Sequence, residues 1–465
     1  MRSKVMYLSL VALLAMTGCG GSGSSSGSTT GSGSGSGGGG STGGTTATAT
    51  ATVNFGAQKQ VIRGFGGSTA WLGTLTTPQA TALYSQSTGL GLSILRVRID
   101  PSGSASNNFV TGQWTEELNN AEEVKVANSN AIVFASPWTP PPAWKTSSTS
   151  QPFYSGTPAC TPVALCGGYL DPSHYADYAD YLEDFVTYFK DNGVNLYGIS
   201  MQNEPDWSAQ PGENYESCSW TAAQMDAWIA GDAATLTTKL IMPEAFSFNS
   251  AMYATALADP NAADKISIIA GHLYGSAPTY QTLAENAGKD VWMTEHFLSP
   301  AGGSGAQPTI SDALKMAEEI HTSMVTAEFN AYVWWWIWDD PADGVNYGLI
   351  DSSTSNPAPT YDGYAMGQFS KFIQPGYYRY DATANPTTDV YVSAYAGNNH
   401  YVIVAINGSS APVNQTFNIQ GATVTSMTPW QTSSSGGLQE QSGVTVGGDS
   451  FTYSLPAQSI TTFVQ

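Results

Sequence analysis

The chain has 465 residues, and its 36 Asp and Glu outnumber its 15 Lys and Arg, which gives a formal net charge of −21 at pH 7. This charge argues against nucleic acid and anionic membrane surfaces as partners, because both attract basic proteins. Charged residues make up only 11% of the chain and aromatic residues another 11%, which suits an exported protein that faces an uncharged polar ligand. The length indicates one large domain and a smaller one.

The N-terminal segment has the features of an export signal. Residues 1–4 form a short basic head, and the apolar stretch at residues 5–16 is too short to cross a bilayer as a helix. The small residues that end in Cys19 resemble a bacterial lipobox. Residues 1–19 therefore predict a lipoprotein signal peptide with Cys19 as the lipidated N-terminus, held at the outer membrane or cell surface. Ordinary cleavage, with Cys19 unmodified and the protein secreted, is the alternative.

Residues 20–46 contain only Gly, Ser and Thr, a composition that predicts a flexible linker. Residues 47–60 follow, and within them residues 48–55 alternate apolar and polar side chains as a β-strand does. The same alternation returns only near the C-terminus. We therefore expect residues 47–60 to add a strand to a C-terminal β-domain.

Residues 61–374 alternate short apolar runs with amphipathic stretches. Residues 173–190 and 311–325 repeat apolar side chains at steps of three and four, which predicts helices. Eight apolar runs separated by such segments are typical of a (β/α)8 TIM barrel, an α/β fold whose strands are buried on both faces. The runs are residues 62–65, 92–99, 131–135, 196–201, 238–242, 266–270, 291–294 and 331–336.

Three cysteines lie within the barrel region. Export makes a disulfide plausible, and Cys160 and Cys166 flank a short loop that could close on itself. Either of them could instead pair with Cys218, and the spacing does not choose between these pairings. The five His residues are scattered without a metal-binding spacing. The sequence predicts no metal ion and no cofactor.

The pattern changes at residue 375. Val, Ile, Tyr and Thr alternate between turns rich in Gly, Asn and Ser, which predicts an antiparallel β-sandwich over residues 375–465. With the strand from residues 47–60, this side domain would be built from both ends of the barrel and held rigidly against it. The expected strands are residues 389–396, 401–406, 413–419, 422–428 and 460–464.

Two glutamates follow the fourth and seventh predicted barrel strands, at the end of the barrel where TIM-barrel active sites lie. Glu204 stands in the motif Asn-Glu-Pro, and Glu295 ends the run Trp-Met-Thr-Glu. Two carboxyl groups about 5–5.5 Å apart are the pair that cleaves glycosidic bonds with retention. The alternative for Asn-Glu-Pro is a simple strand-ending turn, because Pro prevents further ladder bonds. The presence of both glutamates favours catalysis.

Aromatic residues are predicted to surround these glutamates at the strand ends, where they could stack on the apolar faces of sugar rings. They are Trp71, Trp138, Trp144, Tyr274, Trp334, Trp335, Trp336 and Trp338. Alternation along a strand predicts that at least one of the consecutive tryptophans packs against a helix instead. His272 is read as a ligand contact, with a buried core histidine as the alternative. Arg96, near the end of the second strand, could hold a catalytic carboxylate in its charged form.

With these residues in view, the chain resembles glycoside hydrolase family 30, and most closely its bacterial xylanase subfamily, the glucuronoxylan xylanohydrolases. The likeness extends over about residues 60–464 and includes blocks from both predicted domains. The shared motifs are GFGG (64–67), ILR (94–96), FASPW (134–138), NGVNLY (192–197), QNEPD (202–206), HLYG (272–275), WMTE (292–295), AYVWW (331–335), VYVSAY (390–395), VIVAIN (402–407) and LPAQSITTFV (455–464).

The resemblance implies a barrel with a fused side β-domain and a retaining mechanism on β-1,4-xylan. It assigns Glu204 as acid/base and Glu295 as nucleophile. It implies that the subsites nearest the cleaved bond are lined by Trp71, Trp138, Asn203, His272 and Tyr274, and we add Trp335 from the aromatic rim. Xylan or xylo-oligosaccharides are the expected partners, and the expected state is a monomer.

One departure from the family pattern concerns the methylglucuronic acid branches of xylan. Members that depend on these branches carry an Arg shortly after the strand-eight tryptophans, whereas this chain has Trp338, Asp339 and Asp340 there. An aspartate would repel an anionic branch. We therefore predict that glucuronate is not required. The alternatives are an exo-acting, xylobiohydrolase-like enzyme, another family 30 activity such as a β-1,6-glucanase or β-glycosidase, and an inactive glycan-binding lipoprotein.

Overall fold

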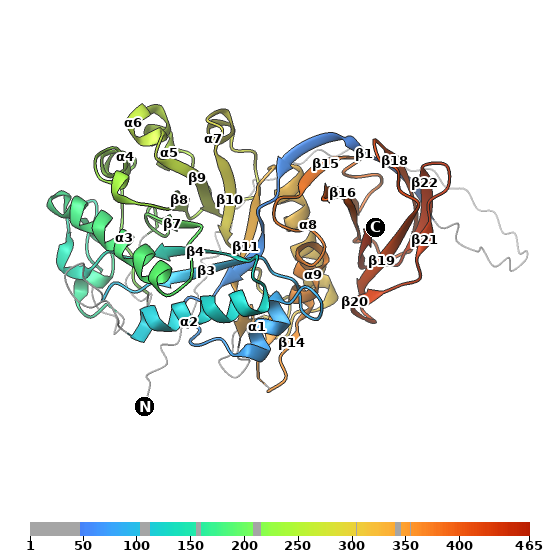
Figure 1. Ribbon diagram of the computed structural model, residues 1–465, viewed down its shortest axis with the longest axis horizontal. Helices are drawn as coiled ribbons and strands as arrows, with labels where there is room; N and C mark the ends of the chain where they lie inside the picture. Colours follow the sequence, from blue (N-terminus) through green and yellow to red (C-terminus); the bar gives the residue numbers. More distant parts are fainter. Residues whose placement is uncertain are drawn as a thin grey trace, which may run out of the picture.

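The computed structural model describes residues 47–102, 112–154, 160–207, 215–303, 305–339, 346–353 and 355–465 (Figure 1). The predicted signal peptide with Cys19, the predicted linker and Asp340 lie outside the described residues. Within the described residues, no helix combines the length and the apolarity that a membrane crossing requires.

Eight parallel strands close into a barrel, which confirms the predicted fold. Their order around the barrel is β10-β11-β2-β3-β4-β7-β8-β9. Each lies within or beside one of the eight apolar runs, since the β-branched and aromatic residues of those runs are buried on both sides. The strands are β2 (Gly64–Ser68), β3 (Ile94–Ile99), β4 (Ile132–Pro137), β7 (Gly198–Ser200), β8 (Lys239–Ala245), β9 (Ile266–His272), β10 (Asp290–Glu295) and β11 (Ala331–Trp336).

Packed side chains fill the barrel below its catalytic end. Trp292 of β10 meets Phe134 of β4 edge to face, with ring centroids 5.8 Å apart. The inward side chains make one buried apolar cluster: Ile94, Phe134, Ile241, Ile268, Ala270, Trp292, Ala331 and Val333. This cluster fills the interior of the barrel, so the polar side chains at the carboxyl ends of the strands rest on rigid packing.

Helices surround the barrel, and those predicted at residues 173–190 and 311–325 are present as α3 (Tyr175–Asp191) and α8 (Ile310–Val325). Thr309 is the N-cap residue of α8, and its backbone N–H and its hydroxyl both donate to the carboxylate of Asp312 in the first turn. The other helices are α1 (Thr77–Tyr84), α2 (Gly112–Ala127), α4 (Ala222–Gly231), α5 (Ala251–Ala258), α6 (Pro260–Ala263), α7 (Thr282–Asn286) and α9 (Tyr361–Ser370).

Short elements lie in the loops between the main strands and helices. They are strands β5 (Lys145–Thr146), β6 (Tyr169–Leu170), β12 (Trp338–Asp339), β13 (Ile350–Asp351) and β14 (Ala358–Pro359), with 3-10 turns η1 (Pro142–Trp144), η2 (Val163–Leu165), η3 (Pro172–His174) and η4 (Ala233–Thr235). Cys160 and Cys166 form a disulfide beside η2, and Cys218 is a buried free thiol. The pairing that the spacing left open is thus the one within the short loop.

The C-terminal residues form a second sheet, to which the N-terminal strand β1 (Ala47–Val61) contributes as predicted. Its order is β20-β19-β23-β17-β16-β15-β1-β18-β22, and β21 pairs with β19. Its strands are β15 (Tyr378–Ala382), β16 (Val390–Gly397), β17 (His400–Asn407), β18 (Val413–Gln420), β19 (Ser426–Ser433), β20 (Gly436–Glu440), β21 (Val444–Thr445), β22 (Ser450–Leu455) and β23 (Ser459–Val464).

Two details of this sheet differ from the prediction. The pairing of β1 with β18 is parallel, so the sheet is mixed where an antiparallel one was expected. The strand expected at residues 422–428 begins later, at Ser426, because Gly421 turns the chain with a left-handed backbone (φ +72°) and a pairing segment follows only after this turn.

The side sheet curls over a core of its own. The ring of Phe417 on β18 lies 5.1 Å from that of Phe463 on β23, although these strands are far apart in the sheet order. Phe451 on β22 contacts both rings. Figure 1 shows helices α8 and α9 between this sheet and the barrel.

Polar contacts join the side sheet to those helices. Gln60 of β1 donates to the backbone oxygen of Met324 at the end of α8, at 2.6 Å. Thr462 of β23 donates to the backbone oxygen of Gln368 in α9, at 2.7 Å. Only two residues separate β1 from the first barrel strand. The two ends of the chain therefore attach the side sheet to the barrel at several points.

Candidate active site

Unusual backbone conformations mark the carboxyl ends of three barrel strands. Trp71 after β2, Glu204 after β7 and Glu244 on β8 have left-handed backbones, with φ of 60°, 44° and 54°. Such conformations cost a non-glycine residue about 1–3 kcal/mol each and gather at functional sites. The backbone N–H of Glu204 donates to the backbone oxygen of Glu244 at 3.0 Å, which joins two of these residues.

Glu204 and Glu295 come together at this end of the barrel, as predicted. Both are almost fully buried, with 6% and 5% of their surface exposed. One carboxylate oxygen of each, with a ring nitrogen of His272, lies within 4.8 Å of the others. This separation is close to the 5–5.5 Å of retaining glycosidases and well short of the 6.5–9.5 Å that an inverting pair needs.

Arg96 of β3 lies beneath the nucleophile candidate, as predicted, and has no exposed surface. Its guanidinium forms an ion pair with Oε2 of Glu295 and a second one, at 3.1 Å, with Glu244. The same group donates to Oδ1 of Asn203 at 2.6 Å and to the hydroxyl of Ser136 at 3.1 Å. Four partners therefore fix the guanidinium, and through it the position of Glu295.

The hydroxyl of Tyr274 donates to the other oxygen of Glu295 at 2.9 Å. Burial, together with the negative charges of Glu295 and Glu204, raises the pKa of Tyr274 well above its usual value. The phenol therefore keeps its proton and acts only as a donor to this carboxylate. Both oxygens of Glu295 thus have partners that hold it in one orientation.

Glu204 accepts a hydrogen bond from Nδ1 of His272 at 2.8 Å. Burial is the largest influence on its carboxyl group and raises its pKa to about 7, against the opposing effect of His272. The charge of Glu295 also raises this pKa, but it contributes less than burial. A carboxyl group with this pKa is protonated in a large fraction of molecules near neutral pH, as a general acid requires.

His272 ends β9 and is fully buried. It is more than a packed core histidine, because its Nδ1 contacts Glu204 and its Nε2 lies 3.9 Å from Glu244. Burial opposes its charged form, but Glu295, Glu204 and Glu244 outweigh burial and raise the pKa of His272 to about 9. The three carboxylates therefore favour the protonated imidazole.

Three of the predicted tryptophans form one wall of the site. The ring of Trp71 lies 4.8 Å from that of Trp138 and 6.1 Å from that of Trp335, and the last two are 5.9 Å apart. The guanidinium of Arg96 lies 4.6 Å from the ring centre of Trp138, and that of Arg98 lies 4.9 Å from Trp71. These two guanidinium groups thus hold the tryptophan wall in place beside the buried charges of the site.

The other predicted rim tryptophans have different surroundings. Trp334 is fully buried and donates to the backbone oxygen of Tyr347, so it is the packing residue that strand alternation predicted. A register irregularity between Trp334 and Trp336 lets both Trp335 and Trp336 reach the surface, where their rings stack. Trp144 stacks on His174, outside the wall formed by Trp71, Trp138 and Trp335.

A second row of aromatic rings was not predicted. Its members come from loops after β7, β8, β9, β10 and β12, and neighbouring rings lie between 4.1 and 5.5 Å apart. The row is Trp207, Phe246, Tyr274, Phe297 and Tyr347. Only Tyr274 was recognised in the sequence, although Phe246 and Phe297 could have been found because each lies within four residues of the end of a predicted strand.

Glu244 is the other residue that sequence reasoning missed. It lies near the end of the fifth barrel strand, which the apolar run at residues 238–242 located correctly. A search of every strand end for carboxylates would have found it. Its side chain is fully buried, which raises its pKa, but the positive charge of Arg96 outweighs burial and lowers the pKa of Glu244 to about 2.

The cluster of Glu204, His272 and Glu295 has a spacing that could hold a metal ion. The donor set does not fit one, because Arg96 and Tyr274 engage both oxygens of Glu295 and Nδ1 of His272 is directed at Glu204. The guanidinium already supplies the positive charge that a cation would bring. We therefore derive no step that involves a metal ion.

The segment that replaces the family's glucuronate-binding Arg is described only in part. The backbone of Trp338 and Asp339 pairs with β13, and Asp340 lies outside the described residues. The described Arg and Lys side chains at the barrel mouth are Arg96, Arg98 and Lys145, and each has polar partners. Arg98 is paired with Glu216 and Asp100, and Lys145 donates to Thr139 and to the backbone of Ser217.

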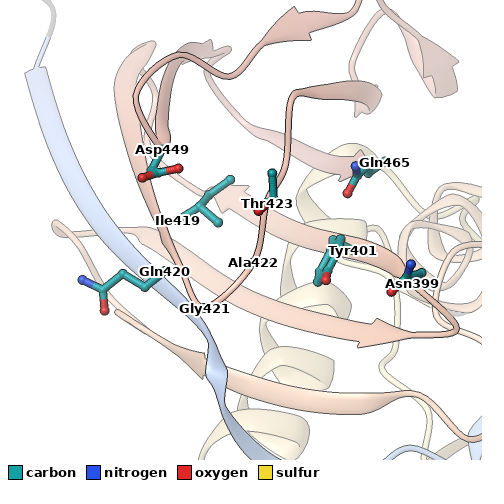
Figure 2. Close-up of a pocket in the computed structure, with 9 residues that line it drawn as sticks. All are labelled: Asn399, Tyr401, Ile419, Gln420, Gly421, Ala422, Thr423, Asp449 and Gln465. Atoms are coloured by element: carbon teal, nitrogen blue, oxygen red, sulfur yellow. The ribbon is translucent and has the colours of Figure 1, made fainter.

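Figure 2 shows a separate hollow on the side sheet, with a volume of about 810 Å³. Its lining comes from β17, the end of β18, the loop after it and the turn before β22. The nine residues are Asn399, Tyr401, Ile419, Gln420, Gly421, Ala422, Thr423, Asp449 and Gln465. None belongs to the barrel, so this hollow is distinct from the carboxylate site.

Comparison with known proteins connects this geometry to an enzyme family. A family model described as the TIM-barrel domain of glycosyl hydrolase family 30 matches residues 113–373. The chain is 40% identical over 419 residues to glucuronoxylanase XynC of Bacillus subtilis (strain 168), a match that covers 89% of this chain and 90% of the relative.

Two solved structures share both domains with the chain. The family 30 subfamily 8 xylanase Xyn30A from Clostridium acetobutylicum is 44% identical, with a TM-score of 0.78 over 89% of this chain and 98% of that one. A family 30 endoxylanase from Clostridium papyrosolvens C71 is 39% identical, with a TM-score of 0.77 over 89% and 99% of the two chains.

Proposed function

Because the chain belongs to glycoside hydrolase family 30, we propose that it hydrolyses the β-1,4-xylosidic bonds of xylan with retention of configuration. The observation that carries this proposal is the placement of Glu204 and Glu295, with carboxylate oxygens within 4.8 Å of each other at the barrel's catalytic end. The xylan specificity is supported by the relatives, which are named as a glucuronoxylanase and as xylanases.

In the first half-reaction, a carboxylate oxygen of Glu295 attacks the anomeric carbon. The glycosidic bond breaks, its electron pair stays with the leaving oxygen, and Glu204 gives that oxygen its proton. A covalent glycosyl-enzyme on Glu295 results. In the second half-reaction, ionised Glu204 takes a proton from water, and the water oxygen attacks the same carbon and releases Glu295. Two inversions give net retention.

The contacts of the site support these two roles. Glu295 is oriented by its ion pair with Arg96 and by the hydrogen bond from Tyr274, as a nucleophile must be. Glu204 has a pKa of about 7 because it is buried, so it can donate a proton and later recover one near neutral pH. The wall of Trp71, Trp138 and Trp335 offers apolar faces for xylose rings beside the pair.

A leaving-group experiment separates the two carboxylates. Nitrophenolate departs without a proton, so Glu204→Ala should lose much less activity on a nitrophenyl xylobioside than on xylan. Glu295→Ala should lose activity on both, because no covalent intermediate can form. Equal losses for Glu204→Ala on the two substrates would contradict its assignment as the acid.

We further propose that the enzyme does not depend on glucuronate branches. The stretch at residues 336–353 contains four Asp and no Lys or Arg. The described mouth cations already have carboxylate, hydroxyl or backbone partners. Losing a charge-assisted contact to the branch typically costs about 2–5 kcal/mol, which would remove a strict preference for branched chains.

The product profile tests this proposal and distinguishes endo from exo cleavage. Glucuronoxylan, arabinoxylan and linear xylo-oligosaccharides should all be cut at comparable rates into a spread of neutral and decorated products. One short neutral product would indicate an exo-acting enzyme. Products that each carry one glucuronate at a fixed position would contradict the proposal and would mean that another residue replaces the missing Arg.

The cellular location is a further part of the proposal. The lipobox-like sequence that ends at Cys19 and the following linker of Gly, Ser and Thr support a lipoprotein tethered to the cell envelope. The catalytic unit would then act on xylan close to the cell. Expression of the full chain and of a Cys19→Ala variant, followed by detergent phase partitioning, tests this. Equal partitioning into the aqueous phase would contradict a lipid anchor.

A further inference from the structure

A third carboxylate lies beneath the proposed catalytic pair. Glu244 on β8 has no exposed surface and a left-handed backbone, with φ of 54°. Its Oε1 lies 3.1 Å from the guanidinium of Arg96 and 3.9 Å from Nε2 of His272. Substrate cannot reach it directly, so its effect on the reaction must pass through these two neighbours.

We propose that Glu244 is a positioning residue that keeps His272 in its doubly protonated form, so that the proton of Glu204 stays available to the leaving group. This inference rests on the proposed function, which makes Glu204 the general acid. It adds a role that neither the proposed mechanism nor the comparisons assign to Glu244.

The geometry around His272 carries the argument. Its two ring nitrogens face two different carboxylates, since Nδ1 is 2.8 Å from Glu204 and Nε2 is 3.9 Å from Glu244. Nε2 is beyond hydrogen-bond distance of Glu244, so Glu244 acts on the ring through its charge, which attracts an imidazolium and not a neutral imidazole. The N–H at Nδ1 donates to Oε1 of Glu204. The proton of the Glu204 carboxyl group is therefore carried by the other carboxyl oxygen.

The other charged and titratable groups around His272 come from several strands. Arg96 comes from β3, Glu204 follows β7, and Glu295 ends β10, with Oε1 4.0 Å from Nδ1. The ring of Tyr274 packs edge-on against the imidazole. Without Glu244, the remaining fixed charges would be one guanidinium and one nucleophile carboxylate, which leave no anion to balance an imidazolium.

The charge of this cluster stays constant through the proposed reaction. Before attack, Arg96 and His272 are cationic, Glu244 and Glu295 are anionic, and Glu204 is neutral, so the sum is zero. In the glycosyl-enzyme, Glu295 is a neutral ester and Glu204 has become anionic, so the sum is again zero. Glu244 supplies the fixed negative charge that makes both states neutral, and low-dielectric surroundings strongly favour such balance.

Replacement of Glu244 by Gln removes that charge while keeping the shape and the backbone oxygen that accepts from Glu204. Loss of an anion favours the deprotonated forms of its neighbours, so the pKa values of the His272 and Glu204 pair both fall. We expect the alkaline limb of kcat/KM on soluble xylan to move to lower pH by about one unit. Activity below that limb should change less.

A second readout needs no turnover. Nitrogen-15 spectra of labelled histidine side chains, with the signal assigned by its absence in His272→Asn, should show a cationic His272 at pH 7 in the wild-type enzyme. The Glu244→Gln variant should show its titration displaced to lower pH. A neutral His272 at pH 7 in the wild-type enzyme would overturn the proposal. So would a folded Glu244→Gln enzyme in which neither the titration of His272 nor the alkaline limb of kcat/KM has moved.

The control is Asp290→Asn. It also removes one carboxylate from an ion pair, with Arg63 at 2.6 Å, but at the opposite end of β10 from Glu295. It should leave the His272 titration and the pH profile unchanged. If wild-type enzyme fails to cut xylan, the proposed function falls while the histidine spectra still test Glu244. If Glu244→Gln does not fold, a neutral His272 in the wild-type spectrum at pH 7 would still overturn the proposal.

Discussion

The mouth of the barrel and the side sheet, formed by the same chain, bury opposite kinds of side chain. The mouth buries charged groups around a small volume: Arg96, Glu204, Glu244, His272 and Glu295. The core of the side sheet is apolar, with Phe417, Phe451 and Phe463 in mutual contact. Buried charges are costly unless they are paired, whereas buried aromatic rings stabilise directly.

Backbone conformation shows the same contrast. At the mouth, left-handed backbones occur at Trp71, Glu204 and Glu244, which contact substrate-facing groups or each other. In the side sheet, most of them occur at turns, as in Asn398 and Asn399 between β16 and β17. The comparison indicates that the strained, charged arrangement at the mouth serves the reaction, and that stability comes from elsewhere in the chain.

The largest expected effect is the loss of turnover in Glu295→Ala. Removal of a nucleophile should lower kcat on xylan by about 10⁴-fold or more, with little loss of folding stability. Reducing-end release measures the rate, and thermal unfolding measures the stability. The exposed Glu122 on α2 provides a matched control, because Glu122→Ala also removes one carboxylate and should leave kcat unchanged. Near-wild-type turnover in Glu295→Ala would contradict the assignment of Glu295 as the nucleophile and the contrast between the two regions.

A substitution in the core of the side sheet should have the converse effect, a loss of stability without a loss of turnover. Phe463→Ala removes a fully buried ring that contacts Phe417, Phe451 and Tyr453, and should cost about 3–5 kcal/mol of unfolding free energy. Because no ring of this core reaches the carboxylates, kcat of the folded enzyme at low temperature should be retained. Denaturant unfolding monitored with activity tests this. A loss of kcat without a loss of stability would show that the two regions are coupled.

A smaller effect is expected for Trp71→Ala. The residue forms part of the tryptophan wall, so its loss should raise KM on xylo-oligosaccharides and lower kcat/KM by about tenfold to a hundredfold, which corresponds to the burial of one aromatic face. Trp144→Ala is the control, since Trp144 is also half-buried but stacks on His174. Equal losses in the two variants would indicate a general structural effect.

The smallest effect is a pH dependence. Burial raises the pKa of Glu204 to about 7, and the acid works only in its protonated form. The kcat/KM for xylan should therefore fall as the pH rises through about 7, and it should not fall there for a nitrophenyl xylobioside whose leaving group needs no proton. An alkaline limb that is the same for both substrates would mean that another group controls it.

Sequence patterns located the rigid parts of the site well. The barrel strands are rich in buried Val, Ile and Leu, so their apolar runs identified all eight, and the strand-end rule then located Glu204 and Glu295. Arg96 was found because it is one of few cations in the chain. These residues occupy positions that local periodicity determines.

The features that sequence missed depend on contacts between distant segments. The charged neighbours of Glu244, Arg96 and His272, come from β3 and β9. The position of Glu244 on its own strand does not predict either of them. Trp144 resembles a rim tryptophan in sequence, yet its ring packs on a histidine 30 residues away. The parallel pairing of β1 with β18 joins the two ends of the chain, a choice that alternation of side chains does not specify.

The anomeric configuration of the first product tests the central claim most directly. Proton NMR of linear xylo-oligosaccharides, recorded within minutes of adding enzyme, distinguishes a β-configured reducing end from the α form that later appears by mutarotation. A double displacement through Glu295 predicts that the β anomer forms first. If the α anomer forms first, a single displacement by water is at work, and the roles given to Glu204 and Glu295 are wrong.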